Sequence, residues 1–181
     1  GVDIVLGPEM RSTGEVMGVD RTFGLAFAKS QAAAGNRLPS KGTIFFSLAD
    51  RDKPTGLRAA RRFAEMGFSF LATAGTAKAL EGEGIAVLDV VAKVGEAGGV
   101  DAVELIASGK VDLVVNTPRG RGPRADGAHI RRATNAHGVP CITTVAAALA
   151  AAGGLAEWFN NEHRVMSLQE YHKGGQPTLG V

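Results

Sequence analysis

The segment Thr73-Ala74-Gly75-Thr76 forms a sharp turn between an apolar run at residues 68–72 and a stretch at residues 77–83 that is typical of a helix. A strand that ends at small and hydroxyl residues, with a helix beginning there, leaves backbone N–H groups unpaired at the start of the helix. The helix dipole adds partial positive charge at that end, and each threonine hydroxyl can donate a hydrogen bond. The turn therefore predicts a binding site for phosphate or carboxylate, and a small phosphorylated molecule is the first ligand that we expect.

The same alternation of strand and helix continues along the chain from residue 41 onward. Short apolar runs predict strands at residues 43–48, 68–72, 86–91, 111–116 and 139–143, with a last strand at a sheet edge over 164–168. Helical patterns predict helices at residues 53–66, 77–83, 100–108, 128–137 and 145–152. This order predicts an α/β fold, with a mainly parallel five-stranded sheet that helices flank on both faces.

The chain divides near residue 40. Before that point an amphipathic stretch at residues 22–34 predicts a helix, and residues 38–42 have the composition of a linker. We therefore expect a short helical segment at residues 1–40, one α/β domain at residues 41–173 and a tail at residues 174–181. The first segment is too small to fold alone, so its apolar helix face must rest on a partner domain.

Composition excludes several classes of protein. Hydrophobic residues make up 45% of the 181 residues, yet no apolar run approaches the roughly 20 residues of a membrane-spanning helix. No signal peptide is visible, and the absence of an initiator Met indicates a fragment of a longer protein. A single cysteine, Cys141, fits a reducing compartment, so the cytoplasm is expected. The net charge of +2 argues against general nucleic-acid binding.

Polar side chains follow the predicted strands, at the edge of a parallel sheet where ligands bind. Most are of types that donate hydrogen bonds to phosphate and sugar oxygens. They are Asp50, Lys53, Thr73, Thr76, Lys93, Asn116, Thr117, Thr143 and Thr144. A separate basic cluster comprises Arg119, Arg121, Arg124, Arg131 and Arg132, which a solvated loop and helix face would explain equally well. The sequence thus predicts one phosphate or nucleotide site at the carboxyl edge of the sheet.

Two groups of motifs carry a resemblance to a known family. Residues 7–18, GPEMRSTGEVMG, followed by Arg21-Thr22-Phe23, resemble the end of the carbamoyl-phosphate-forming ATP-grasp domain in the large subunit of carbamoyl phosphate synthase. The remainder resembles the C-terminal regulatory domain of that subunit, which has the methylglyoxal synthase-like fold, a Rossmann-like arrangement. The matching motifs are Asp52-Lys53, residues 72–77, Asn116-Thr117, Ile130-Arg131-Arg132 and Thr143-Thr144.

The resemblance implies a ligase that makes carbamoyl phosphate from glutamine-derived ammonia, bicarbonate and two ATP, for arginine and pyrimidine synthesis. It implies as partners the rest of the large subunit, a glutaminase small subunit, and further copies of that heterodimer. It also implies that this domain binds an allosteric nucleotide, UMP or IMP. The residues matching the family's nucleotide site are Lys53, Thr73, Thr76, Lys93, Asn116 and, by position alone, Pro118, with Thr117 beside them.

Two departures from the family bear on regulation. Pro118 replaces a hydroxyl residue and has no donor of its own. The effector ornithine sits, in some members, against a tyrosine that corresponds to Cys141, while Thr143 is retained. We therefore expect a nucleotide to regulate the enzyme, either as an inhibitor or as an activator, and ornithine to have little effect. ATP and Mg²⁺ or Mn²⁺ are implied for the intact subunit alone, because its catalytic and metal-binding residues lie upstream of this sequence.

The alternative is a lyase resembling methylglyoxal synthase, which needs a carboxylate base beside the phosphate. Asp50 matches one acidic position of that enzyme. Its catalytic aspartate directly follows a Gly-Gly pair, whereas Val100 follows Gly98-Gly99 here and Asp101 comes one residue late. One residue turns a helical side chain by about 100°. A cyclohydrolase relative shares the threonine turn but would leave residues 7–23 unexplained.

Overall fold

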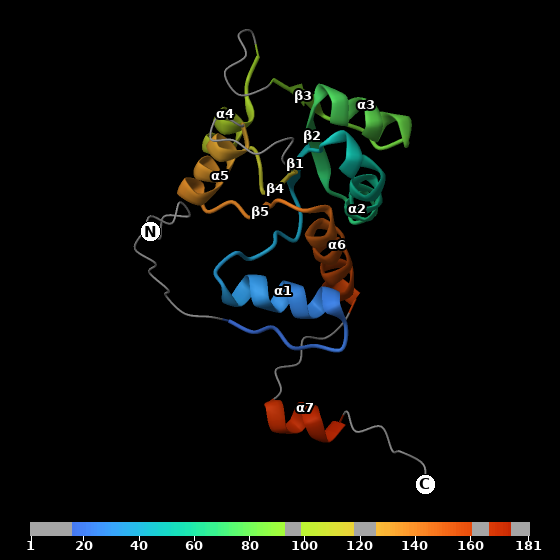
Figure 1. Ribbon diagram of the computed structural model, residues 1–181, viewed down its shortest axis with the longest axis vertical. Coiled ribbons are helices and arrows are strands. Elements are labelled where there is room, and N and C mark those ends of the chain that lie inside the picture. The colour runs from blue at the N-terminus through green and yellow to red at the C-terminus, as the bar shows by residue number, and fades with distance from the viewer. Residues whose placement is uncertain (1–15, 93–98, 118–125, 161–166, 175–181) are drawn as a thin grey trace.

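A five-stranded parallel sheet forms the centre of the protein (Figure 1). The computed structural model describes residues 16–92, 99–117, 126–160 and 167–174. Within these residues the strand order is β3-β2-β1-β4-β5, and every pairing is parallel. The strands are β1 (Thr43–Ser47), β2 (Ser69–Thr73), β3 (Asp89–Val91), β4 (Leu113–Asn116) and β5 (Cys141–Ile142). The predicted α/β fold with a parallel sheet is confirmed.

Helices cover both faces of the sheet. The face that carries Phe46 packs against α2 (Lys53–Glu65), α3 (Ala74–Gly82) and α6 (Val145–Asn160). The opposite face packs against α4 (Ala102–Ala107) and α5 (Asp126–His137). Three further elements are α1 (Phe23–Ala33), the short 3-10 helix η1 (Asp50–Asp52) and α7 (Leu168–Gly174).

Strand β1 is buried on both faces, which explains its continuous apolar sequence. Successive side chains of a strand point to opposite faces, so Phe45 and Phe46 enter different cores. The ring of Phe46 packs on Phe63 of α2, with ring centroids 6.4 Å apart. Phe45 lies in the other core, among residues that include Ile106 of α4 and Ile130 of α5.

The direction of winding reverses at β1. The chain runs from β1 outward to β2 and β3, then crosses back to β4 on the other side of β1 and continues to β5. In such sheets, ligands bind beyond the carboxyl ends of the strands at the point of reversal. The loops that follow β1 and β4 therefore flank the expected binding crevice.

Helix α1 crosses α6 below the sheet at a point of close backbone approach (Figure 1). A Cβ on Gly154 would lie 2.1 Å from the carbonyl oxygen of Gly24, and a Cβ on Gly24 would lie 2.6 Å from the nitrogen of Gly154. Helix α6 continues through this contact to Asn160, so the expectation that it ends at residue 152 was wrong. The packing of α1 against the glycine pair Gly153-Gly154 outweighs the weak helix propensity of glycine.

We expected a strand over residues 164–168, and this prediction is wrong for the two of these residues that the structure describes. Helix α7 begins at Leu168, while residues 164–166 lie outside the described residues. The Ser167 hydroxyl accepts the N–H of Glu170 at 3.2 Å, and the Glu170 carboxylate accepts the N–H of Ser167 at 2.9 Å. This reciprocal pair is a capping box, and it lowers the pKa of the Glu170 carboxyl, chiefly through the backbone N–H of Ser167. The signal Ser-x-x-Glu is present in the sequence and favours a helix start.

Candidate functional site

Two buried threonines fix the backbone that follows β1. The Thr76 hydroxyl of α3 accepts the N–H of Leu48 at 3.0 Å, and the Thr117 hydroxyl after β4 accepts the N–H of Ala49 at 2.8 Å. Thr76 has no exposed surface, and Thr117 is 3% exposed. Because they bind neighbouring amides from opposite sides, these threonines hold the loop after β1 between β2 and β4. That loop leads directly into Asp50 and Lys53.

The first turn of α3 has no side-chain cap. Thr73 occupies the N-cap position, but its hydroxyl donates to the Thr76 oxygen at 3.2 Å and forms no capping hydrogen bond. Ala74 and Gly75, the first residues of the helix, are exposed. The first N–H groups of a helix have no partner within it, so those of α3 are open to an anion from outside.

Lys53 places a positive charge at the start of α2, beside the loop after β1. Its Nζ lies 2.7 Å from Oδ1 of Asp50. The lysine side chain is 23% exposed and that of Asp50 is 81% exposed. A phosphate that approached Lys53 would therefore compete with a largely solvated carboxylate, which is a weak competitor.

Asn116 ends β4 with its side chain almost enclosed. The residue is 5% exposed, and among the described residues no buried side-chain nitrogen or oxygen lacks a hydrogen-bond partner. An amide side chain offers both donors and an acceptor to a ligand at this edge of the sheet. Sequence reasoning missed the residue that faces this amide, Gly127 of α5, where a Cβ would lie 3.3 Å from Nδ2 of Asn116. The available signal was a glycine in the first turn of a helix.

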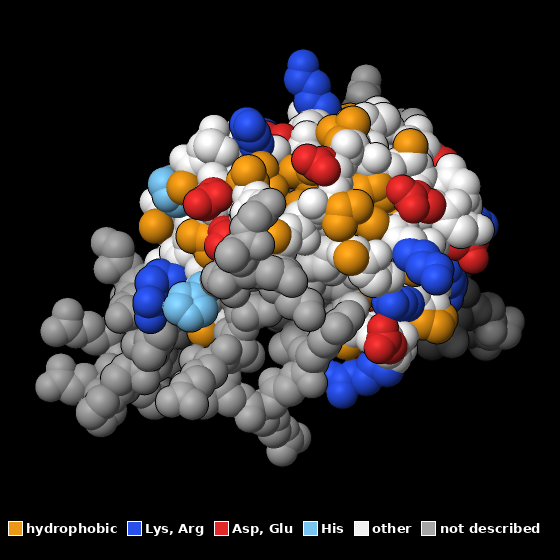
Figure 2. Space-filling model, turned by 90° about the horizontal axis from the view of Figure 1, so that it is seen from above, with side chains coloured by type: hydrophobic (Ala, Val, Ile, Leu, Met, Phe, Trp, Pro, Cys, Tyr) orange, Lys and Arg blue, Asp and Glu red, His pale blue; other side chains and the backbone are white. Residues whose placement is uncertain are grey.

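The predicted site residues fall into two groups. The structure brings Lys53, Thr73, Thr76, Asn116 and Thr117 to the carboxyl edge of β1, β2 and β4. Lys93 and Pro118 lie outside the described residues, as do the first three arginines of the basic cluster. The mixed surface in Figure 2 carries separate Lys or Arg, Asp or Glu and hydrophobic side chains over its described part, without a continuous basic area.

Cys141 and Thr143, the expected remnant of an ornithine site, lie at β5. Cys141 is half-buried and packs in the core between the sheet and α5. Burial raises the pKa of its thiol above the ordinary value, while a hydrogen bond with Thr134 and the charge of Arg131 act in the opposite direction. Thr143 follows β5 and is half-buried.

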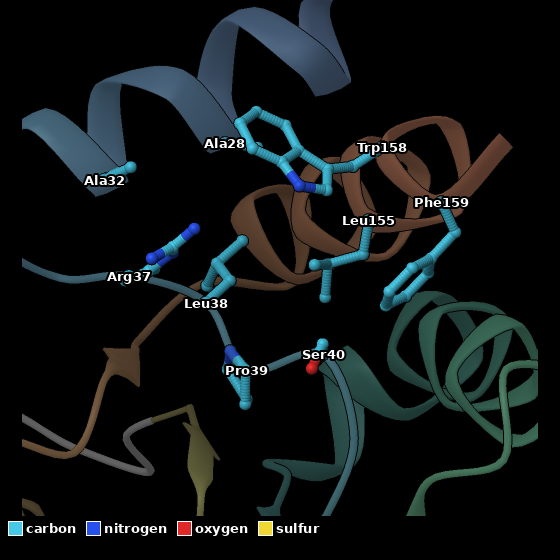
Figure 3. Close-up of a pocket in the computed structure, with 9 residues that line it drawn as sticks. All are labelled: Ala28, Ala32, Arg37, Leu38, Pro39, Ser40, Leu155, Trp158 and Phe159. Carbon is cyan, nitrogen blue, oxygen red and sulfur yellow. The ribbon is translucent and has the colours of Figure 1, made fainter. Parts of the chain in front are cut away.

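A cavity of about 390 Å³ lies away from the predicted site. Figure 3 shows it between α1, α6 and the segment that follows α1, with Trp158 and Leu155 of α6 on one side and Arg37 and Leu38 of that segment on another. None of the predicted nucleotide-site residues lines it. Over the described residues, no group of three or more metal-binding side chains occurs, and no helix has the length and hydrophobicity needed to cross a membrane.

Comparison with known proteins identifies the relatives of this chain. Residues 56–143 match the family model of the MGS-like domain. The carbamoyl phosphate synthase large chain of Rubrobacter xylanophilus is 55% identical over 172 residues, which cover 94% of this chain and 16% of that protein. The chain is homologous to carbamoyl phosphate synthase large chains and contains an MGS-like domain.

Two further large chains are similar to this one, and one solved structure was also matched. The large chain of Streptomyces avermitilis is 51% identical over 175 residues, covering 94% of this chain and 16% of that protein. The C-terminal section of the Methanopyrus kandleri large chain is 50% identical over 175 residues, covering 96% of this chain and 32% of that protein. A methylglyoxal synthase structure from Elizabethkingia anophelis gives a TM-score of 0.48 at 21% identity, covering 78% of this chain and 96% of that chain. The chain thus spans only 16% of the length of the full large chains that it matches.

Proposed function

We propose that this chain binds a nucleoside monophosphate at the carboxyl ends of β1, β2 and β4, and that the bound nucleotide regulates a carbamoyl phosphate synthase. The observation that carries the proposal is the uncapped first turn of α3. Its N–H groups are open although Thr73 stands at the N-cap position. Those groups would hold the phosphate together with the Thr73 hydroxyl, which would turn from the Thr76 oxygen to donate to it, and Lys53 would neutralise the charge.

The remaining residues of the site supply a frame and a second contact. Thr76 and Thr117 fix the loop after β1 and keep Lys53 beside the phosphate position. The Asn116 amide, at the carboxyl end of β4, would bind the sugar or base. Lys93, which follows β3 in the sequence, would add a second positive charge.

The intact large chain in this proposal makes carbamoyl phosphate in the cytoplasm, with a glutaminase small subunit and ATP, for arginine and pyrimidine synthesis. Support for a neighbouring domain comes from large apolar side chains at the start of the described chain. Met17 is 72% exposed and Phe23 is 75% exposed. The part described here would be regulatory and not catalytic, and nothing in its geometry favours the lyase alternative.

Calorimetric titration of the chain with UMP and IMP at fixed ionic strength tests the proposal. We expect Lys53→Met to weaken binding at least tenfold, because a charge-assisted hydrogen bond contributes about 1.5–3 kcal/mol. Lys110→Met is the matched control, since Lys110 is exposed and precedes β4 at the opposite edge of the sheet. Asp50→Asn should strengthen binding by up to about fivefold, because it frees Lys53 from an exposed ion pair.

Lys93→Ala extends the test to a residue outside the described part of the chain. This substitution should also weaken the binding of UMP or IMP at least tenfold while leaving the melting temperature unchanged. Ornithine should give little or no heat, since Cys141 lacks the aromatic hydroxyl at that position. Absence of nucleotide binding to the unmodified protein, or equal binding by Lys53→Met and Lys110→Met, would refute the proposed site.

A further inference from the structure

The cavity between α1 and α6 is large enough to hold a small molecule. Its volume is about 390 Å³. Ligand pockets commonly have volumes of about 300–1,000 Å³, whereas the packing of a protein interior leaves few spaces larger than one water molecule. The residues around the cavity belong to α1, to α6 and to the α1–β1 segment, residues 34–42, which joins α1 to the sheet. A space of this size at the junction of three elements is therefore a candidate ligand site.

Most of the cavity wall is apolar. Leu155 and Trp158 lie on α6, and Leu38 of the α1–β1 segment lies across from them (Figure 3). Phe159 also lines the cavity, and it is 48% exposed, so a ligand that covered it would remove apolar surface from water. Aromatic side chains favour apolar and aromatic ligand groups beside them. These walls fit the apolar body of a ligand.

Arg37 gives the cavity a positive charge at one end. Figure 3 shows its side chain on the side of the cavity away from Phe159. Among the described residues that line the cavity, none is acidic and Arg37 alone is basic. A guanidinium binds a carboxylate through two parallel hydrogen bonds, and the nearby Ser40 hydroxyl can donate another. The charge therefore favours a ligand that carries one negative group.

We propose that this cavity binds a monocarboxylate with an apolar or aromatic body. Its carboxylate pairs with Arg37, and its body packs on Leu155 and Trp158. A phosphate dianion fits less well, because a single cation would leave part of its charge unpaired. The cavity shares no lining residue with the proposed nucleotide site, so it is a second site with a different ligand. A ligand there would contact all three elements at once and would hold the α1–β1 segment against α6.

Trp158 makes binding directly measurable, because it is the only tryptophan in the chain. Phenylbutyrate and phenylbutyramide serve as probes of nearly equal shape, one an anion and the other neutral. Titration of the chain with each probe, followed by the fluorescence of Trp158, gives the two affinities. The acid should bind roughly three- to fivefold more tightly than the amide at low salt, as expected for an exposed ion pair. This preference should decrease in about 0.5 M sodium chloride, because salt screens exposed charges.

Arg37→Met tests the charge. The affinity for phenylbutyrate should fall roughly three- to fivefold, to that of the amide, while the amide should bind no more weakly than before. Arg58→Met is the matched control, since Arg58 is an exposed arginine of α2 that does not line the cavity. That variant should keep both affinities and the preference for the acid.

Ala32→Leu tests the location. Ala32 lines the cavity from α1, so a leucine there would occupy part of the space and weaken both probes at least fivefold. Ala33→Leu makes the same change at an exposed neighbour that does not line the cavity, and it should leave both affinities unchanged. Both alanines are exposed, and leucine is a good helix former, so neither variant should lower the melting temperature.

The outcomes separate this proposal from the proposed nucleotide site. It is overturned if neither probe changes the fluorescence of Trp158, or if the unmodified protein binds the acid and the amide equally. Equal effects of Arg37→Met and Arg58→Met also overturn it, as does full binding by Ala32→Leu, because the probe would then lie elsewhere. Binding of UMP and IMP should be the same in all four variants, so failure here leaves the nucleotide proposal standing.

Discussion

The Thr76 hydroxyl accepts the backbone N–H of Leu48 at 3.0 Å, although the two residues belong to different strand–helix units of the chain. Thr76 lies in α3, after β2, while Leu48 directly follows β1. The contact joins the start of α3 to the loop that leads into α2. The turn after β2 and the first positive charge of α2 are thereby held in one arrangement, as a shared phosphate site requires.

Removal of the Thr76 hydroxyl should destabilise the fold. Thr76→Val keeps the shape of the side chain but leaves the N–H of Leu48 unpaired, and burying an unpaired donor costs about 1–3 kcal/mol. Thr76→Ser keeps the hydroxyl and should cost less. Urea unfolding, followed by circular dichroism, measures both free energies. Equal stability of Thr76→Val and the unmodified protein would mean that this hydrogen bond contributes nothing.

The crossing of α1 and α6 should tolerate no side chain at its centre. Gly154→Ala would place a Cβ 2.1 Å from the carbonyl oxygen of Gly24, so the two helices must separate. We expect the free energy of unfolding to fall by about 1–3 kcal/mol, the usual cost of overpacking. The melting temperature should fall with it, by about 2–4 °C for each kcal/mol.

Gly82→Ala provides the control for that substitution. Gly82 ends α3, and a Cβ there would meet nothing within 4 Å. Alanine has the better helix propensity, so this variant should be as stable as the unmodified protein, or more stable by up to about 1 kcal/mol. If both alanine variants changed stability in the same direction and by the same amount, helix propensity and not packing would be the cause.

The central strands could be predicted from sequence because each is buried on both faces. β1, β2 and β4 begin and end within two residues of the predicted bounds. The outer strands are shorter than predicted, with β3 limited to Asp89–Val91 and β5 to Cys141–Ile142. Each of these has only one neighbour in the sheet, so its pairing ends where the neighbour's register ends. Hydrophobic runs carry no information about that register.

The location of the site could be predicted from sequence, but the role of each residue within it could not. Topology alone places Thr73, Thr76, Asn116 and Thr117 at the carboxyl edge. Thr76 and Thr117 accept backbone N–H groups of the loop after β1, so their hydroxyls hold the protein's own backbone. The hydrogen-bond partner of each hydroxyl depends on how segments far apart in the sequence come together. The residues next to each threonine do not reveal that partner.

Asp101 should prove to be a helix cap and not a catalytic base. Its carboxylate accepts the N–H of Val103 at 2.8 Å and of Glu104 at 3.1 Å, which caps α4. Asp101→Ala should therefore lower the free energy of unfolding by about 0.5–2 kcal/mol, and Asp101→Asn by less. Neither the unmodified protein nor either variant should form methylglyoxal from dihydroxyacetone phosphate. If the unmodified protein forms methylglyoxal and Asp101→Asn does not, the lyase alternative is supported and this prediction is wrong.

Cys141 should react slowly with alkylating reagents near neutral pH. Burial raises the pKa of its thiol, so the reactive thiolate forms at higher pH than in a free cysteine. The alkylation rate with iodoacetamide, followed by mass spectrometry across pH, should reach half its maximum at a higher pH in the folded protein than in urea. The charge of Arg131 lowers this pKa, so Arg131→Gln should move the midpoint to still higher pH, while Arg132→Gln should not.

The same raised pKa gives a sign for the dependence of stability on pH. A thiol whose pKa is higher in the folded state keeps its proton longer there, so it stabilises the fold fully below the pKa of the unfolded chain. That contribution is lost as pH rises from the unfolded pKa through the folded one. Cys141→Ala should therefore show a shallower loss of stability in urea unfolding as the pH rises above the ordinary thiol pKa of about 8.5. A folded-state midpoint for alkylation at or below that of the unfolded chain would show that Cys141 is solvated and that both expectations are wrong.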